Sequence, residues 1–183
     1  MDQDSRKLFG GAIEATIPSR FIDVSDFRPV PDHQEVFSDE AAGQSIIIEI
    51  VEYSKTGEEC PARFYFNDLA AMNGAIEWEE TSESEELAVS DSVPRLGGSG
   101  LVPAATRVFC VKGAMLVDRK RSQHAEGHQH RVQVVLGVIR LPDKDTDVLL
   151  SLNTPSEEPA ERGYSLFLEI LASFHIADWS LFG

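Results

Sequence analysis

Cysteine is scarce in this sequence. Its 183 residues include only Cys60 and Cys110, which stand far apart and form no CxxC spacing. A disulfide framework or a zinc site built from cysteines therefore has no support. Because a free cysteine often behaves as a small buried hydrophobic residue, we expect both thiols to be reduced and structural.

Lysine and arginine are also few. The sequence has 16 of them against 31 aspartates and glutamates, which gives a formal net charge of -15. A nucleic-acid partner is not expected, because phosphate backbones require clustered lysine and arginine. A protein of this charge favours basic partners.

Long apolar runs are missing as well. No stretch approaches the roughly 18 consecutive apolar residues that a membrane helix needs. The opening residues "MDQDSRKLFGG" lack the apolar segment of a secretory signal. We therefore expect an intracellular protein that does not insert into membranes.

Familiar catalytic motifs do not occur in the sequence. It has neither the GxxxxGK[ST] phosphate loop nor the GxSxG nucleophile elbow, and "GGSG" at 97–100 lacks the lysine that phosphate binding needs. Neither cysteine has a local signature that pairs it with a base. We expect no catalytic residue and no cofactor.

Histidines gather in one stretch, "HAEGHQHR". On a helix His124 and His128 would share one face, as zinc ligands must, and His130 follows closely. Gly127 interrupts such a helix, and a metal site needs convergent geometry that this pattern does not provide. A solvated hairpin loop is the preferred interpretation and no metal is expected. A metal-dependent enzyme stays open as an alternative that depends on this cluster alone.

Apolar periodicity predicts the secondary structure along most of the chain. Strands are predicted at 11–18, 33–38, 44–53, 131–141 and 146–153, and helices at 61–74 and over most of 156–176. The strand at 44–53 is apolar on both faces, which predicts cover on both sides. The expected fold class is α+β, with a central, mostly antiparallel sheet sandwiched between α-helices.

Residues 77–100 differ from the rest in composition. "EWEETSESEELAVSD" carries seven acidic residues and no basic one, and "PRLGGSG" follows it with three glycines in four positions. This composition predicts an acidic surface loop rather than a boundary between domains. We expect one domain over 1–183.

The stretch "FIDVSDFRPVPDHQEVF" at 21–37 fits neither an ordinary strand nor an ordinary helix. Pro29 and Pro31 withhold backbone donors and favour extended neighbours, so no helix runs through them. Its phenylalanine and valine side chains can anchor the segment in the core, while its acidic side chains cap turns or face a partner.

Five segments of the sequence together resemble one known family. They are "LFGGAIEATIP" at 8–18, "RFIDVSDFRPVPDHQEVF" at 20–37, "SIIIEIVE" at 45–52, "IRLPDKDTDVLLSLNTP" at 139–155 and "FHIADWSLFG" at 174–183. They keep the same order along the chain as in that family and cover about half of the chain. The family that they resemble is the Mog family of Ran-binding nuclear-import factors.

The resemblance implies both a fold and a function. The implied fold is a central antiparallel sheet between helices, shared with the PsbP proteins of photosystem II. The implied function is binding to the small GTPase Ran and release of its guanine nucleotide, in support of nuclear protein import. The expected protein is a monomer of the nucleus and cytoplasm.

Six acidic residues form the predicted Ran-binding set. Glu49 and Glu52 come first, because the acids through which the family binds Ran are expected in the matching strand. Without the resemblance, protection of a strand edge explains Glu49 equally well. The other four lie in the acidic segment already quoted: Asp23, Asp26, Asp32 and Glu35.

A second interpretation assigns the same fold but no binding to a GTPase. A non-catalytic structural adaptor of the PsbP-like kind would have the same sheet and helices but would bind no Ran. Binding to Ran in its nucleotide-free and loaded forms distinguishes the two interpretations.

Overall fold

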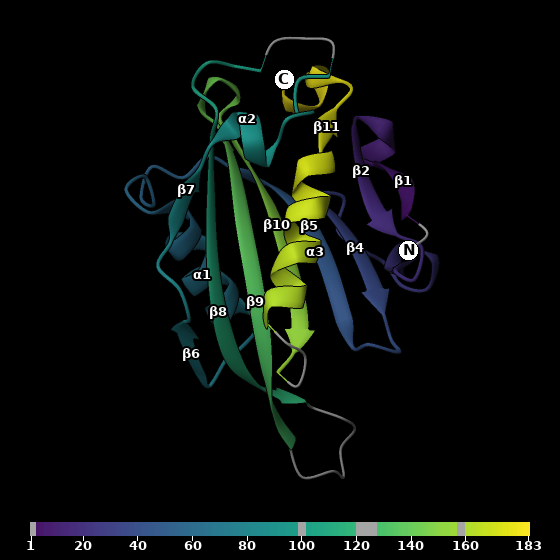
Figure 1. Ribbon diagram of the computed structural model, residues 1–183, viewed down its shortest axis with the longest axis vertical. Helices are drawn as coiled ribbons and strands as arrows, with labels where there is room; N and C mark the ends of the chain where they lie inside the picture. The colour runs from purple at the N-terminus through teal and green to yellow at the C-terminus, as the bar shows by residue number, and fades with distance from the viewer. Residues whose placement is uncertain (1–2, 99–101, 120–127, 157–159) are drawn as a thin grey trace.

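The apolar runs of the sequence become neighbouring strands in a large antiparallel sheet (Figure 1). The computed structural model describes residues 3–98, 102–119, 128–156 and 160–183. The sheet has eight strands in the order β3-β4-β5-β10-β9-β8-β6, and β7 also pairs with β8. Their bounds are β3 (Ile22–Asp23), β4 (Gln34–Asp39), β5 (Gln44–Glu52), β6 (Glu77–Glu80), β7 (Glu85–Leu87), β8 (Arg107–Arg119), β9 (His128–Leu141) and β10 (Thr146–Pro155).

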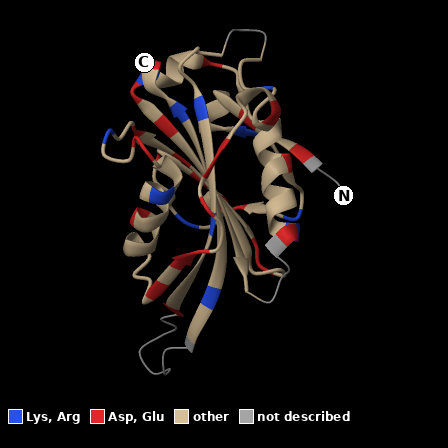
Figure 2. Ribbon diagram, turned by 60° about the vertical axis from the view of Figure 1, so that its left-hand side comes forward, with Lys and Arg blue, Asp and Glu red and all other residues tan. Residues whose placement is uncertain are grey.

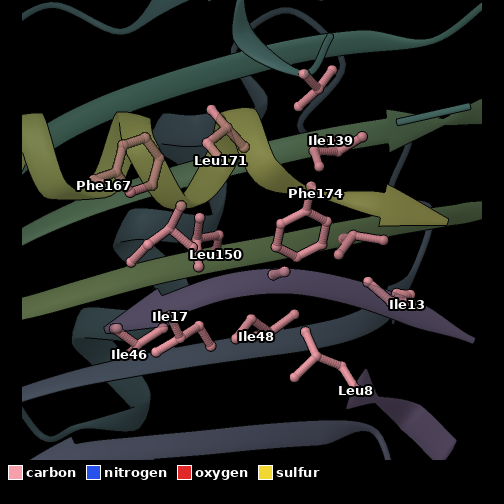
Figure 3. Packing of buried hydrophobic residues seen from close by; sticks show 14 of the residues in the cluster. Leu8, Ile13, Ile17, Ile46, Ile48, Ile139, Leu150, Phe167, Leu171 and Phe174 are labelled. Carbon is pink, nitrogen blue, oxygen red and sulfur yellow. The ribbon is translucent and has the colours of Figure 1, made fainter. Parts of the chain in front are cut away.

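One face of this sheet is covered by a helix and by a second, smaller sheet. The smaller sheet has the order β1-β2-β11, with β1 (Gln3–Leu8), β2 (Ile13–Pro18) and β11 (His175–Ile176). The helix α3 (Ala160–Ser173) contacts β2, β9 and β10. Figure 3 shows Phe167 and Leu171 of α3 packed with Ile17 of β2 and Ile48 of β5 in the main hydrophobic core.

The opposite face carries the helix α1 (Pro61–Met72), which contacts β8 and β9 (Figure 2). Glycines in these strands let aromatic rings approach the backbone from both sides. A Cβ on Gly137 would lie 2.6 Å from Cζ of Phe167, and a Cβ on Gly113 would collide with the ring of Phe66. The two glycines therefore set how closely α3 and α1 pack on the sheet.

Short elements complete the chain. They are η1 (Phe9–Gly11), η2 (Val24–Asp26), α2 (Val89–Ser92), η3 (Pro142–Lys144) and η4 (Trp179–Phe182). No helix in the described ranges has the length and apolar character needed to cross a membrane.

The expected fold class is confirmed. Each predicted strand forms, with ends within a few residues of the expected ones, and α1 begins at Pro61 and is capped at Asn73. The layer over one face is richer than predicted, because α3 shares it with the three-stranded sheet.

The prediction of a surface loop at 77–100 is wrong for residues 77–98. β6 and β7 pair with β8, and α2 follows them. Val93 and Leu96 are fully buried in the main core. The composition gave no sign of these strands, because their acidic side chains are mostly exposed and the strands form by backbone pairing with β8.

The prediction of cover on both sides of the strand at 44–53 is also wrong. Ile46 and Ile48 of β5 are fully buried, but Ile47 and Val51 on the other face are only partly buried. The reason is the position of α1, which lies over β8 and β9 instead of β5.

A buried ion pair links the strands to α1. Nε and Nη2 of Arg140 donate to the two carboxylate oxygens of Asp147 at 3.0 and 3.1 Å, and both side chains are essentially inaccessible. The hydroxyl of Tyr65 in α1 donates to Asp147 Oδ2 at 2.7 Å, and Arg140 Nη2 donates to the carbonyl oxygen of Ser54 at 2.6 Å. These bonds satisfy the buried carboxylate and fix α1 against the sheet.

Candidate functional site

Segments from distant parts of the sequence meet around an open hollow of about 620 Å³. They are η1, the proline segment before β4, the start of β4, one residue of β5, and η4 near the C-terminal end. The lining residues are Phe9, Gly10, Ser25, Val30, Pro31, Asp32, His33, Gln34, Glu35, Ile50 and Leu181. We call this surface the Glu35 hollow.

The Glu35 hollow depends on an unusual backbone at η1. Phe9, Gly10 and Gly11 all have positive φ, at 50, 68 and 95°. Glycine adopts this region freely, whereas a phenylalanine there is strained. The backbone N–H of Phe9 donates to Glu35 Oε1 at 2.5 Å, which ties the strained turn to β4. The "LFGG" residues of the sequence therefore hold the Glu35 carboxylate in place.

Glu35 is the most electrostatically unusual acid of the predicted set. Partial burial raises the pKa of its carboxyl above the ordinary value of 4.5, and the negative charge of Asp23 raises it further. The hydrogen bond from Phe9 N–H acts in the opposite direction, because it stabilises the carboxylate. A cation placed in the hollow would stabilise the Glu35 carboxylate and so offset the effects of burial and of Asp23.

The other acids of the proline segment have different surroundings. Asp32 is exposed and lines the hollow beside Glu35. Asp23 caps η2, because its carboxylate accepts from the N–H of Ser25 at 2.8 Å. Asp26 is exposed in the first turn of η2. The turn-capping role expected for this segment therefore belongs to Asp23, while Asp32 and Glu35 face the hollow.

Glu49 and Glu52 do not form one site. Successive side chains in a strand alternate between faces, and an odd separation puts these two on opposite sides of β5. Glu49 lies beside Gln34 in the register, is 22% exposed, and its Oε1 is 3.4 Å from Nε2 of His33. Glu52 is exposed at the last residue of β5, opposite Thr146. Glu49 therefore reaches solvent on an open sheet face instead of at the expected edge.

The expected absence of a metal site concerns residues that are only partly described. The predicted histidine loop includes His124, Glu126 and Gly127, and these three residues lie outside the described ranges. Elsewhere in the described ranges, no group of three or more histidine, cysteine, aspartate or glutamate side chains could hold a metal ion.

Most of the residues that line the hollow were not predicted as site residues from the sequence. Phe9, His33 and Leu181 line it together with the predicted acids. The available signal was the resemblance itself, since "LFGGA", "PDHQE" and "WSLFG" all lie in the matching segments. Contact between these segments depends on the tertiary fold, which no local pattern encodes.

Comparison with known proteins places the chain in a family. The family model described as Ran-interacting Mog1 protein matches residues 6–155. The chain is 38% identical over 152 residues to the Ran guanine nucleotide release factor of Danio rerio, covering 82% of this chain and 78% of that protein. It is 31% identical over 211 residues to the nuclear import protein MOG1 of Saccharomyces cerevisiae, covering 100% of this chain and 86% of that protein.

A solved structure agrees with these matches. The crystal structure of the Saccharomyces cerevisiae Ran-binding protein Mog1p superposes with a TM-score of 0.71 at 28% identity, covering 100% of both chains. The matched fold, the matched length and the family model lead to one conclusion: the chain belongs to the Ran-interacting Mog1 protein family.

Proposed function

We propose that this protein binds the small GTPase Ran, promotes release of its guanine nucleotide, and thereby supports nuclear protein import. The observation that carries the proposal is membership of the Ran-interacting Mog1 family, together with relatives named as Ran guanine nucleotide release factors. The protein acts as a regulator without catalytic residues or a cofactor of its own. It works in the nucleus and cytoplasm, as a monomer of one domain over 1–183.

The Glu35 hollow is the proposed contact surface for Ran. Its lining residues come from the segments that carry the family resemblance, and they include the acids Asp32 and Glu35. Asp23 and Asp26 extend the acidic surface along the same segment. An acidic hollow with a desolvated carboxylate favours a lysine or arginine from the partner, because a cation offsets the cost of burying the charge.

Nucleotide release follows from binding alone. A protein that binds nucleotide-free Ran more tightly than loaded Ran must weaken nucleotide affinity by the same factor. A GTPase of this class holds its phosphates with a lysine and Mg²⁺. A carboxylate presented near these groups could compete for the lysine or disturb the ion, and Glu35 is our first choice for that role.

Glu49 and Glu52 also belong to the six proposed Ran-binding acids, but neither of them lines the Glu35 hollow. Glu52 lies on the same face of β5 as Ile50, which lines the hollow, and it can extend the contact beyond its rim. Glu49 lies on the opposite face and neighbours the hollow through His33 and Gln34. We therefore propose that charge reversal at Glu35 or Asp32 weakens Ran binding more than reversal at Glu49.

The test is release of a fluorescent guanine nucleotide from Ran. Saturating protein should speed release, and the Glu35→Lys variant should need at least about tenfold more protein for the same effect. Glu83→Lys, at an exposed acid between β6 and β7, serves as the matched control and should behave like the unmodified protein. Unchanged release at saturation contradicts the exchange function, while equal loss in both variants contradicts the assigned surface.

A further inference from the structure

One face of the large sheet is only half covered. In the described ranges α1 is the helix that packs on this face, and it contacts β8 and β9. The neighbouring strands β3, β4, β5 and β10 extend beyond it. Their register places Val36, Ile47 and Ser151 in one row, with Gln34, Glu49 and Leu149 in the next.

Apolar side chains line this uncovered area and remain accessible. Ile22 is 54% exposed, Phe27 is 76% exposed, and Met72 at the end of α1 is 75% exposed. Two hollows of about 550 and 270 Å³ lie over the area and share Ile47. The two hollows adjoin at Ile47 between Phe27 and α1, and we call them together the open sheet groove. Exposed apolar surface gathered in this way marks a recognition site more often than scattered single residues do.

The charges around the groove are mainly negative. Glu40 lines one end, and Glu49 and Asp68 line the end beside α1. The positive groups that face it are Arg28 at the first end and His33, which contacts Glu49. The groove therefore combines an apolar floor with an acidic border beside α1, while its other end carries one acid and one base.

We propose that the open sheet groove binds an amphipathic helix of a partner protein, with an apolar stripe toward the sheet and lysines or arginines at its flanks. A second helix beside α1 would complete the layer on this face, as helices pack side by side on other sheets. The floor from Ser45 to Val51 is about 20 Å long at the rise of a strand, which matches a helix of about 13 residues. Binding of an amphipathic helix in an apolar groove is a common recognition mode.

The open sheet groove and the Glu35 hollow adjoin at Gln34, which lines both, but their floors differ. Glu35 pairs with Ile48 in the register and lies on the face covered by α3, whereas Val36 and Ile47 lie on the other face. The two surfaces therefore lie on opposite faces of β4 and β5. The peptide assay below uses the protein without Ran, so the inference does not depend on the proposed Ran contact.

The test uses three synthetic 13-residue peptides with the same leucine stripe and with lysine, glutamine or glutamate at the flanking positions. Fluorescence anisotropy with the full chain should show the tightest binding for the lysine peptide and the weakest for the glutamate peptide. Added salt should weaken only the lysine peptide, because its flanks pair with exposed acids. Equal affinity for all three peptides, or none for any, overturns the proposal.

Variants locate the site. Phe27→Ser and Asp68→Lys change exposed residues and should each weaken the lysine peptide by at least about fivefold, the loss typical of an important interface residue. Ile76→Ser alters an apolar residue that is 46% exposed outside the groove, and it should leave the affinity unchanged. Amide shifts in NMR spectra should fall on β3, β4, β5 and the end of α1. Shifts centred on the Glu35 hollow, or self-association that Phe27→Ser abolishes, would overturn the proposed occupant.

Discussion

The buried pair of Arg140 and Asp147 gives the sharpest prediction for stability. Replacing Asp147 with Asn keeps the size of the side chain and an acceptor for Tyr65, but it leaves the Arg140 guanidinium buried without its counter-charge. Arg140 is 2% exposed, so water cannot compensate. Breaking a buried ion pair in this way costs about 3–5 kcal/mol of the free energy of unfolding.

That magnitude can be measured by urea unfolding. With a slope of about 2 kcal/mol per M, the midpoint should fall by about 1.5–2.5 M while the slope stays unchanged. Asp143→Asn, at an exposed acid before the same strand, is the matched control and should change the free energy of unfolding by less than about 0.5 kcal/mol. If Asp147→Asn lowers the free energy of unfolding by less than about 1 kcal/mol, Arg140 does not need the Asp147 charge in order to be buried, and the reasoning is refuted.

Further predictions concern Glu35, Gly137, Cys110 and the segment from 77 to 98. Burial raises the pKa of Glu35 above 4.5 in the folded protein, so the ionised carboxylate destabilises the fold at any pH above that raised pKa. Glu35→Gln should therefore raise the free energy of unfolding at neutral pH. This gain should disappear below pH 4.5, where the carboxyl is protonated in both the folded and the unfolded protein. Ran affinity should fall as the pH drops through the same pKa, and Glu35→Gln should flatten that dependence. Gly137→Ala should cost about 1–3 kcal/mol in thermal unfolding, because the new Cβ lies 2.6 Å from the Phe167 ring. Burial raises the pKa of the Cys110 thiol to about 12, so a thiol reagent should modify Cys60 alone in the native protein. Replacing 77–98 with a short linker should lower the melting temperature by removing Leu96 from the core, and an unchanged melting temperature would show that the segment is dispensable.

Local sequence patterns accounted for most of the strands and for α1. The β-branched residues at 46–48 predicted β5, and Pro61 predicted the first turn of α1, so local composition was sufficient for both elements. β6 and β7 were missed because their outward-facing glutamates dominate the composition, while pairing with β8 is a long-range property. The half-covered face of β5 was missed for a similar reason, since the position of α1 depends on long-range packing such as that of Phe66 against Gly113 of β8.

The candidate site was predictable only in part. Glu35 and Asp32 were named from the acidic proline segment, but Phe9 and Leu181 reach the hollow from near the two ends of the chain. Nothing in the local sequence indicates that Phe9 donates its N–H to Glu35, or that this carboxylate is desolvated. Glu49 and Glu52 looked like a pair in the sequence, whereas the alternation of β5 separates them.

The most direct test of the central claim compares the affinity of this protein for nucleotide-free Ran with its affinity for nucleotide-loaded Ran. The account predicts tighter binding to the nucleotide-free form, by the same factor by which the protein weakens nucleotide affinity. It also predicts that Glu35→Lys reduces the binding to nucleotide-free Ran by at least about tenfold. Equal affinity for the two forms of Ran would contradict the account.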